Sequence, residues 1–314
     1  MDTNAPVFSK NDNLKFFRTL NKRVNDYFKE NNIDKTGNWK LHLKTIVMFA
    51  IFLTPYFFLL AMQMPFWAYL LLNVVIGIGM AGVGMNVMHD GNHGAYSNKS
   101  WINKIMGGSI YILAGNVYNW QVQHNVLHHT YTNILGHDED LEAGRILRFT
   151  KEAKWYNHHK FQHYYSFILY GLLTFNWAIT TDFQQMRRYL KRNLSYGEFK
   201  KPAVRWTTLV ITKVIYFSMW IVIPILVGHV SWWQVLIGFF IMHYTAGVIL
   251  SVVFQLAHVV NETAHDPLRH RDRQRPRARR VRGGRSAQVR DRRSPRGCGH
   301  LRFQAAPWRG DHAD

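Results

Sequence analysis

Apolar residues in this chain of 314 residues gather in long runs and do not alternate with polar ones. Four of the runs, at about residues 45–63, 66–88, 206–228 and 232–256, are long enough to cross the ~30 Å hydrocarbon core of a bilayer as helices that rise ~1.5 Å per residue. A very short link joins the first run to the second, and another joins the third to the fourth. The pattern therefore predicts an all-α integral membrane protein whose four transmembrane helices form two hairpins.

The apolar stretches outside these runs are weaker. Those at about residues 105–117 and 163–180 are predicted to be interfacial or re-entrant, because one more crossing would move the basic segment 187–201 to the opposite side. Lys213, inside the third run, is expected near the cytoplasmic end, where its ammonium group can reach the interface. The basic flanks of the runs predict a multi-pass protein with its N-terminus and histidine clusters on the cytoplasmic side.

Residues 1–43 are polar and precede the first run. No apolar core follows a short basic start, so this segment is not a signal peptide. It is predicted to form a cytoplasmic amphipathic helix at the membrane interface, with basic residues on the opposite face. The apolar side chains at helical spacing are Phe16, Phe17, Leu20, Val24 and Phe28.

Composition changes sharply near His265. Residues 44–265 are interpreted as the membrane domain, whereas residues 266–314 hold 15 Arg, no Lys and 5 Asp, which is +10 of the formal net charge of +20. Such a segment cannot bury much apolar area, so the tail is predicted to be disordered. A frameshift or chimeric junction near His265 would explain the change. We expect no nucleic-acid partner, because the charge of the remaining chain flanks its apolar runs.

Histidine is abundant, with 17 residues, while Cys298 is the only cysteine, so a metal would be held through nitrogen or oxygen. Two clusters stand out: His89 and His93 in HDGNH, directly after the second run, and His124, His128 and His129 in HNVLHH. On an α-helix His124 and His128 share a face, whereas His129 is rotated by ~100° and would supply a ligand in a second direction. Zinc sites use three or four ligands, so five histidines favour a pair of redox-active irons.

These clusters, with QVQHNVLHHTYTN and GHDEDLE around the second, resemble those of the membrane fatty-acid desaturases, in particular the front-end branch, over about residues 7–265. The resemblance implies an enzyme that introduces a double bond into a fatty-acyl chain carried by CoA or by a membrane lipid. It implies two iron ions (Fe2+/Fe3+) as cofactor, O2 as co-substrate, a separate electron donor of the ferredoxin or cytochrome type, and no catalytic residue apart from the metal ligands. The ligands that it implies are His89, His93, His124, His128, His129 and, in FQLAHVV, His258.

One feature of that family is absent from the sequence. Its members carry a third histidine box of the form (H/Q)xxHH after the fourth run, but beyond His159 this chain has no two adjacent histidines. The chain could therefore be inactive. Two other interpretations stay open: a hydroxylase or ketolase of the same superfamily, and a non-catalytic membrane protein that binds metal or haem.

The remaining polar candidates are assigned structural or supporting roles. Lone histidines are expected to be packed or capped: His42, His229 and His243. An HHxxxH group is assigned to an interfacial helix: His158, His159 and His163. Because the Glu-x-x-His pattern of soluble di-iron bundles is missing near the clusters, nearby carboxylates and amides are expected to hydrogen-bond to imidazoles and not to bind metal. These are Asp138, Glu139, Asp140, Asn92 and Asn125.

Overall fold

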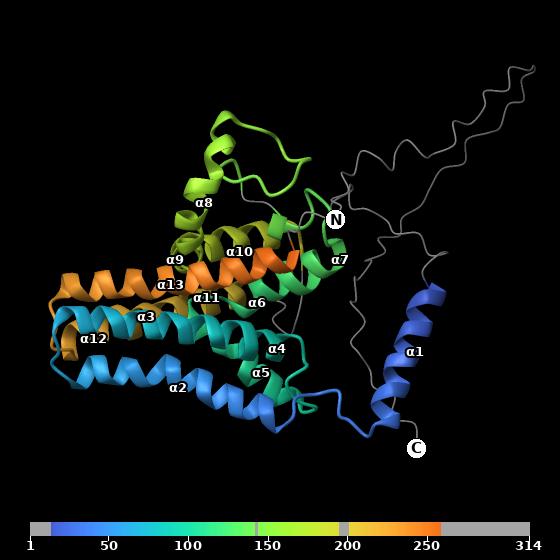
Figure 1. The fold of residues 1–314 in the computed structure, drawn as a ribbon, viewed down its shortest axis with the longest axis horizontal. Coiled ribbons are helices and arrows are strands. Elements are labelled where there is room, and N and C mark those ends of the chain that lie inside the picture. Colours follow the sequence, from blue (N-terminus) through green and yellow to red (C-terminus); the bar gives the residue numbers. More distant parts are fainter. Residues whose placement is uncertain (1–13, 142–143, 195–200, 259–314) are drawn as a thin grey trace, which may run out of the picture. The chain divides into compact units, whose positions relative to one another are not determined.

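The computed structural model describes residues 14–141, 144–194 and 201–258 (Figure 1). The chain divides into two compact units, Met1–Pro267 and Leu268–Asp314, and all described residues belong to the first. Within the described residues the secondary structure is helical and contains no strand. The Arg-rich tail and the proposed junction at His265 lie outside the described residues.

Four helices of the described chain are long and apolar enough to cross a membrane, which confirms the four predicted spans. The first is α2 (Trp39–Ala61), and the second is α3 (Phe66–Val83) continued through η1 (Gly84–Met88) and α4 (His89–Asn92). The third is α11 (Pro202–Phe217) continued through η7 (Ser218–Val222) and α12 (Ile223–Val227), and the fourth is α13 (Trp232–His258). Apolar side chains on their outer faces are exposed, for example Leu226 at 76%, as lipid-facing residues are.

α3 packs between α2 and α13 (Figure 1). Glycine makes both contacts close. A Cβ at Gly79 would lie 2.5 Å from the backbone nitrogen of Phe52 in α2, and a Cβ at Gly77 would lie 2.5 Å from the carbonyl oxygen of Met242 in α13. Small residues let membrane helices approach closely, so these positions fix how the second span, which leads into the first histidine cluster, lies between its neighbours.

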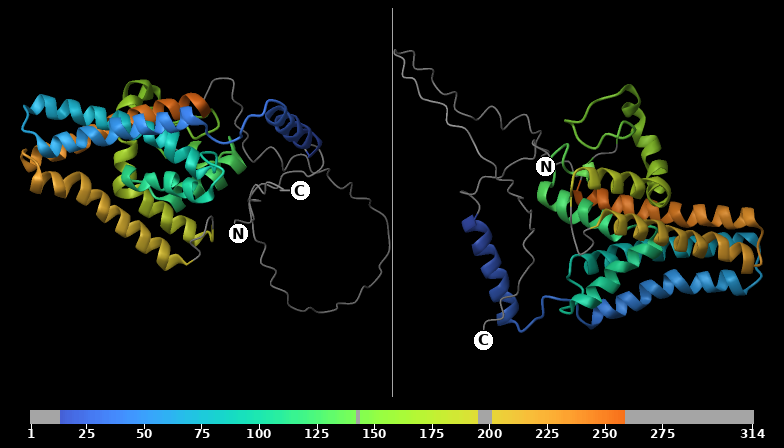
Figure 2. Two further views of the ribbon diagram at one scale, coloured as in Figure 1. Left: turned by 90° about the horizontal axis from the view of Figure 1, so that it is seen from below. Right: turned by 180° about the vertical axis from the view of Figure 1, so that it is seen from behind.

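The backbone of the third span approaches that of α13 most closely near their short link and diverges from it toward the end where α4 lies (Figure 2), although Tyr216 of α11 still reaches His243 of α13. α13 packs instead on α3, α8 and α9. Shorter helices connect the second span to the third: α5 (Ser100–Gly108), η2 (Ser109–Leu113), α6 (Val117–Trp120), η3 (Gln121–His128), α7 (His129–Tyr131), η4 (Glu139–Leu141), η5 (Asn157–Phe161), α8 (Gln162–Gly171), α9 (Leu173–Asn176), η6 (Trp177–Thr181) and α10 (Asp182–Lys191). Neither of the weaker apolar stretches is among the candidate spans.

α1 (Leu14–Glu30) is the helix predicted near the N-terminus. Its apolar side chains Phe16, Phe17, Leu20 and Val24 are all exposed. An apolar stripe that the protein does not cover fits the predicted position at a membrane interface, which stays a prediction.

Lys213 differs from the sequence-based expectation. Its side chain does not reach the interface but is 4% exposed, with Nζ 2.8 Å from Oδ2 of Asp182, which is fully buried. The ammonium group also donates hydrogen bonds to the carbonyl oxygens of Ala114 (2.5 Å) and Trp177 (3.0 Å). A charged group inside a membrane span needs a partner, and here a carboxylate from a neighbouring helix supplies it. The ion pair therefore fastens α11 to α10 instead of marking the edge of the bilayer.

Asp182 also binds the helix that precedes the second histidine cluster. Asn119, in α6, donates from Nδ2 to the carbonyl oxygen (2.8 Å) and to Oδ1 (3.0 Å) of Asp182. All three polar side chains, those of Asn119, Asp182 and Lys213, are buried. The third span and α10 thus hold the start of the helix on which the second cluster lies.

Candidate metal centre

The first histidine cluster lies on the helical extension of the second span, as the sequence predicted. The span passes through one π-helical turn, η1, in which the backbone N–H of His89 donates to the carbonyl oxygen of Gly84, five residues back. An α-helical turn follows, so that His93 N–H donates to His89 O at 3.0 Å. The two rings therefore lie edge to face on one side of α4, with centroids 4.5 Å apart.

The second cluster lies on a π-helix, η3, and this corrects the predicted direction of His129. On the α-helix predicted from the sequence, His129 would face away from His124. In the structure the His129 N–H donates to His124 O, five residues back, because a π-helix has wider turns. Residues i and i+5 then lie one above the other, and the ring centroids of His124 and His129 are 4.7 Å apart. All three histidines of HNVLHH thus belong to one cluster.

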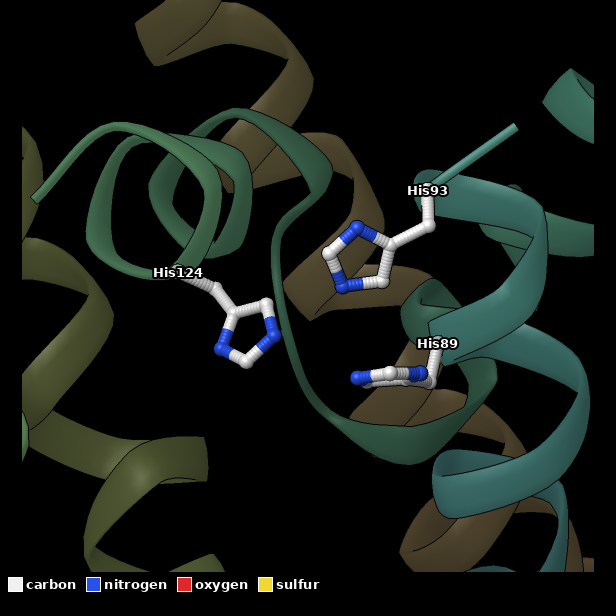
Figure 3. Close-up of side chains that lie close together, drawn as sticks. All are labelled: His89, His93 and His124. Atoms are coloured by element: carbon white, nitrogen blue, oxygen red, sulfur yellow. The ribbon is translucent and has the colours of Figure 1, made fainter. Parts of the chain in front are cut away.

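The two clusters meet in space although about 30 residues separate them in sequence. Figure 3 shows His89 and His93 pointing from one helix toward His124 on another. Ring centroids are 5.1 Å apart for His89 and His124, and 5.0 Å apart for His93 and both His124 and His129. One ring nitrogen from each of His89, His93 and His124 lies within 4.8 Å of the other two. This separation suits imidazoles that share a bound ion, since zinc–nitrogen bonds, for comparison, are ~2.0–2.1 Å long.

Burial favours the uncharged, electron-pair-donating form of His93, His124 and His129. His124 is 7% exposed, and its Nε2 has no hydrogen-bond partner within the described part of the chain. Desolvation, followed by the neighbouring imidazoles, lowers the pKa of His124 to about 2 and that of His93 to about 4, and it also lowers the pKa of His129. Neutral imidazole is the form that binds metal, and a buried nitrogen without a partner is costly unless something fills the place. The residues present therefore fit a metal ion.

His128 is held by two carboxylates, as the sequence analysis expected of this acidic segment. Its Nδ1 lies 3.0 Å from Oδ1 of Asp138 and 3.1 Å from Oδ2 of Asp140. Burial alone would lower the pKa of His128, but the two carboxylates outweigh it and raise that pKa. A carboxylate that binds one imidazole nitrogen fixes the tautomer and the direction of the other nitrogen, as partners of metal-binding histidines commonly do.

Glu139 points the other way from its neighbours Asp138 and Asp140. Its Oε2 accepts a hydrogen bond from the hydroxyl of Tyr189 at 2.6 Å and from Arg188 at 2.9 Å, both on α10. The expectation that Glu139 binds an imidazole is therefore wrong. The carboxylates of Asp138 and Asp140 bind His128, while Glu139 fastens the same turn to α10.

Comparison with known proteins explains this arrangement. A sequence model described as "Fatty acid desaturase" matches residues 65–284. The chain belongs to this family. It is 36% identical to the sn-1 linoleoyl-lipid 6-desaturase of Arthrospira platensis over 263 residues, which cover 82% of the chain and 69% of that protein. It is 31% identical to the enzyme of the same name from a Synechocystis strain, over 79% of the chain and 68% of that protein. No solved structure matches the chain significantly.

A more distant relative is the acyl-lipid (8-3)-desaturase of Physcomitrium patens, 27% identical over 81% of the chain but only 53% of that protein. All three relatives are desaturases that their names assign to lipid substrates. The chain is accordingly a fatty-acid desaturase of the membrane type, with four candidate spans and a histidine group suited to metal.

Two glutamines of this desaturase were not singled out from the sequence. Gln185 on α10 donates to Oε1 of Gln123 on η3 at 2.6 Å, and Gln123 donates to Oδ1 of Asp140 at 2.7 Å. Burial raises the pKa of Asp140 to about 6, although the Gln123 hydrogen bond and His128 act in the opposite direction. The position of Gln123 next to His124 was a weak signal; nothing local points to Gln185, which lies 62 residues further along.

Trp120 is a second residue of the desaturase centre that the sequence did not reveal. Its ring lies 4.5 Å from that of His124, at an interplanar angle of 30°, and 5.7 Å from the rings of both His89 and His93. Trp120 is buried in the main apolar core. It thus separates the histidine group from that core. Its place directly before the QVQH segment carried no recognisable signal.

Five other histidines of the described chain make contacts that fit their predicted structural roles: His42, His158, His159, His163 and His243. His158 and His159 each have Nε2 within hydrogen-bond distance of Arg145 O, at 2.7 and 3.0 Å. His243 is bonded on both ring nitrogens, to the Tyr216 hydroxyl (2.6 Å) and Thr174 Oγ1 (3.0 Å). His42 contacts the Tyr96 hydroxyl, and His163 contacts the ring of Tyr164. His258 ends α13, and its side chain lies outside what the structure describes.

Proposed function

We propose that this chain introduces a double bond into the acyl chain of a membrane lipid, using O2 and a pair of iron ions held by its histidines. The observation that carries the proposal is the convergence of four imidazoles from the two distant clusters, those of His89, His93, His124 and His129, together with the buried Nε2 of His124, which has no hydrogen-bond partner among the described residues. The names of the relatives, which specify lipid-linked acyl chains, favour a lipid carrier over CoA.

The histidines of both clusters would hold the irons, and bound iron would supply the activation of O2 needed to oxidise an unreactive hydrocarbon. The proposed ligands are His89, His93, His124, His128, His129 and His258. His258 ends the helix whose Phe254 ring lies 6.2 Å from that of His128, so the backbone brings it to this end of the molecule. Asp138 and Asp140 fix the ring of His128 and take no part as ligands.

The protein residues around this centre orient the histidine group and shield one side of it. Trp120 covers the histidine group on the core side, while His93 and His129 are exposed on the other. Electrons from a separate protein donor, of the ferredoxin or cytochrome type, can therefore arrive at the exposed side. We place that side, and the N-terminus, in the cytoplasm, because basic residues such as Arg187, Arg188 and Lys191 flank the spans there. The two pairs of spans would form hairpins that return the chain to this side.

Expression in a host that lacks the product fatty acid tests the proposal. Mass spectrometry of the host lipids should show acyl chains that have lost two hydrogens, and His124→Ala should abolish that product together with bound iron. An acyl chain that gains an oxygen would identify a hydroxylase instead. Because the third histidine box is absent, iron is measured in the purified chain as well. Iron without any oxygen-dependent product would identify a non-catalytic metal-binding protein, and absence of iron would refute the site.

A further inference from the structure

Asn92, the fourth residue of the HDGNH motif, makes four hydrogen bonds. Its Nδ2 donates to Met88 O (3.1 Å) and Gly107 O (3.0 Å). Its Oδ1 accepts from Nε2 of Gln121 at 3.0 Å, and its backbone oxygen accepts from Nδ2 of Asn125 at 3.2 Å. Asn92 is 9% exposed, so these bonds are largely shielded from water. One residue of the first cluster is thus tied to two residues of the helix that carries the second.

The bonds lie directly beside the candidate ligands. Asn92 precedes His93, and Asn125 follows His124. Gln121 and Asn125 are four residues apart on η3, so both side chains can reach the same residue of α4 while His124 faces His89 and His93. A shift of either helix at this point would move a ring of the metal group by a similar distance.

Close backbone packing supports the same contact from the other side. A Cβ at Gly107, in α5, would lie 2.8 Å from Oδ1 of Asn92, and a Cβ at Gly91 would lie 2.4 Å from the backbone nitrogen of Gly107. The absence of side chains at both glycines lets α5 reach the amide of Asn92. The amide is therefore held in a single orientation, with its oxygen directed at Gln121.

The imidazoles cannot set this spacing themselves. His124 Nε2 makes no hydrogen bond within the described chain. We propose that Asn92, Gln121 and Asn125 are positioning residues, a brace between the two histidine clusters that sets their separation before a metal binds. The proposal rests on the function proposed above only in assigning the histidines to a metal. The brace itself consists of hydrogen bonds between protein residues and does not depend on a bound metal.

Gln121→Met tests the brace in the full-length chain, because methionine keeps the length of the side chain and removes the N–H donor. Gln184→Met is the matched control, since Gln184 lies exposed on α10. Titration with Co2+, followed by its visible absorption, should show affinity up to about 10-fold weaker for Gln121→Met than for wild type. Loss of a direct partner of a metal ligand costs about 10- to 100-fold, and Gln121 acts one step further away, through Asn92. Gln184→Met should match wild type.

Hydrogen–deuterium exchange without metal provides an independent measurement. In Gln121→Met, backbone amides of residues 88–96 should exchange faster than in wild type, while those of residues 232–257 should not change. Equal exchange in the two proteins overturns the brace, and so does unchanged Co2+ affinity. If wild type binds no Co2+ at all, the proposed metal site fails, and the exchange measurement still decides whether the brace exists. Asn125→Leu provides a second variant for both measurements, should Gln121→Met not accumulate in membranes.

Discussion

Replacement of Lys213 by methionine should destabilise the protein by an amount that the structure allows us to estimate. The Lys213 ammonium is the charged partner of Asp182, whose side chain is fully buried. Removal of one member of a buried ion pair leaves the other charge uncompensated, which typically costs about 3–5 kcal/mol. In contrast, Lys44→Met replaces an exposed lysine of another span and should change the free energy of unfolding by less than about 0.5 kcal/mol.

The double variant Lys213→Met/Asp182→Asn should recover most of the loss. It leaves no charge at either of these two positions, and an amide oxygen at position 182 can still accept from Asn119. The free energy of unfolding is measured by titrating SDS into detergent micelles while following circular dichroism. A Lys213→Met protein as stable as wild type, or a double variant as unstable as the single one, would refute the assignment of a buried ion pair.

The pH dependence of the Lys213→Met variant provides a further check. In wild type, burial already raises the pKa of Asp182, while Lys213 and Asn119 oppose the shift. Without the ammonium group this pKa rises further, so the folded variant binds a proton that the unfolded chain, with an ordinary Asp pKa of about 3.9, has released. Stability of the variant relative to wild type should therefore be higher at about pH 5 than at about pH 8.

Two other substitutions probe the metal centre and the packing of the spans. Asp138→Asn should weaken Co2+ binding by about 10- to 100-fold, because His128 loses a carboxylate that orients it. The same substitution lowers the pKa of His128, so competition from protons between about pH 8 and about pH 6 should be smaller than in wild type; an unchanged pH profile would contradict the role of Asp138. Gly79→Val should cost more than about 3 kcal/mol of stability or prevent folding, because its Cβ would meet the backbone of α2 at Phe52. Normal thermal unfolding of Gly79→Val in detergent would show that α2 and α3 are not packed this way.

Features that depend on local patterns in the sequence were predictable. The four spans follow from the length of the apolar runs, and HDGNH follows from its place at the end of the second span. The pairing of Asp138 and Asp140 with His128 was expected from chemistry, since a metal-binding imidazole needs a partner for its other nitrogen. Each of these inferences used residues that are neighbours in the chain or share one helix.

Features that depend on tertiary contacts were not predictable. Lys213 was expected at the interface because its partner, Asp182, is 31 positions away and gives no local signal. The side chain of His129 was predicted to point away from His124 because nothing in the residues of HNVLHH indicates a π-helix. In both cases the general rule for one helix was correct, but packing against other helices selected a different outcome.

The π-helical turns before His89 and through His124 make the type of helix a determinant of where the candidate ligands point. Each such turn accommodates one residue more than an α-helical turn would, so the histidines that follow it are rotated relative to the preceding span. If either turn adopted ordinary α-helical hydrogen bonds with the same residues, the downstream imidazoles would swing by ~100°, with every ligand still present in the sequence. A substitution that favours α-helical over π-helical hydrogen bonds in these turns would thus separate the metal ligands without removing any of them.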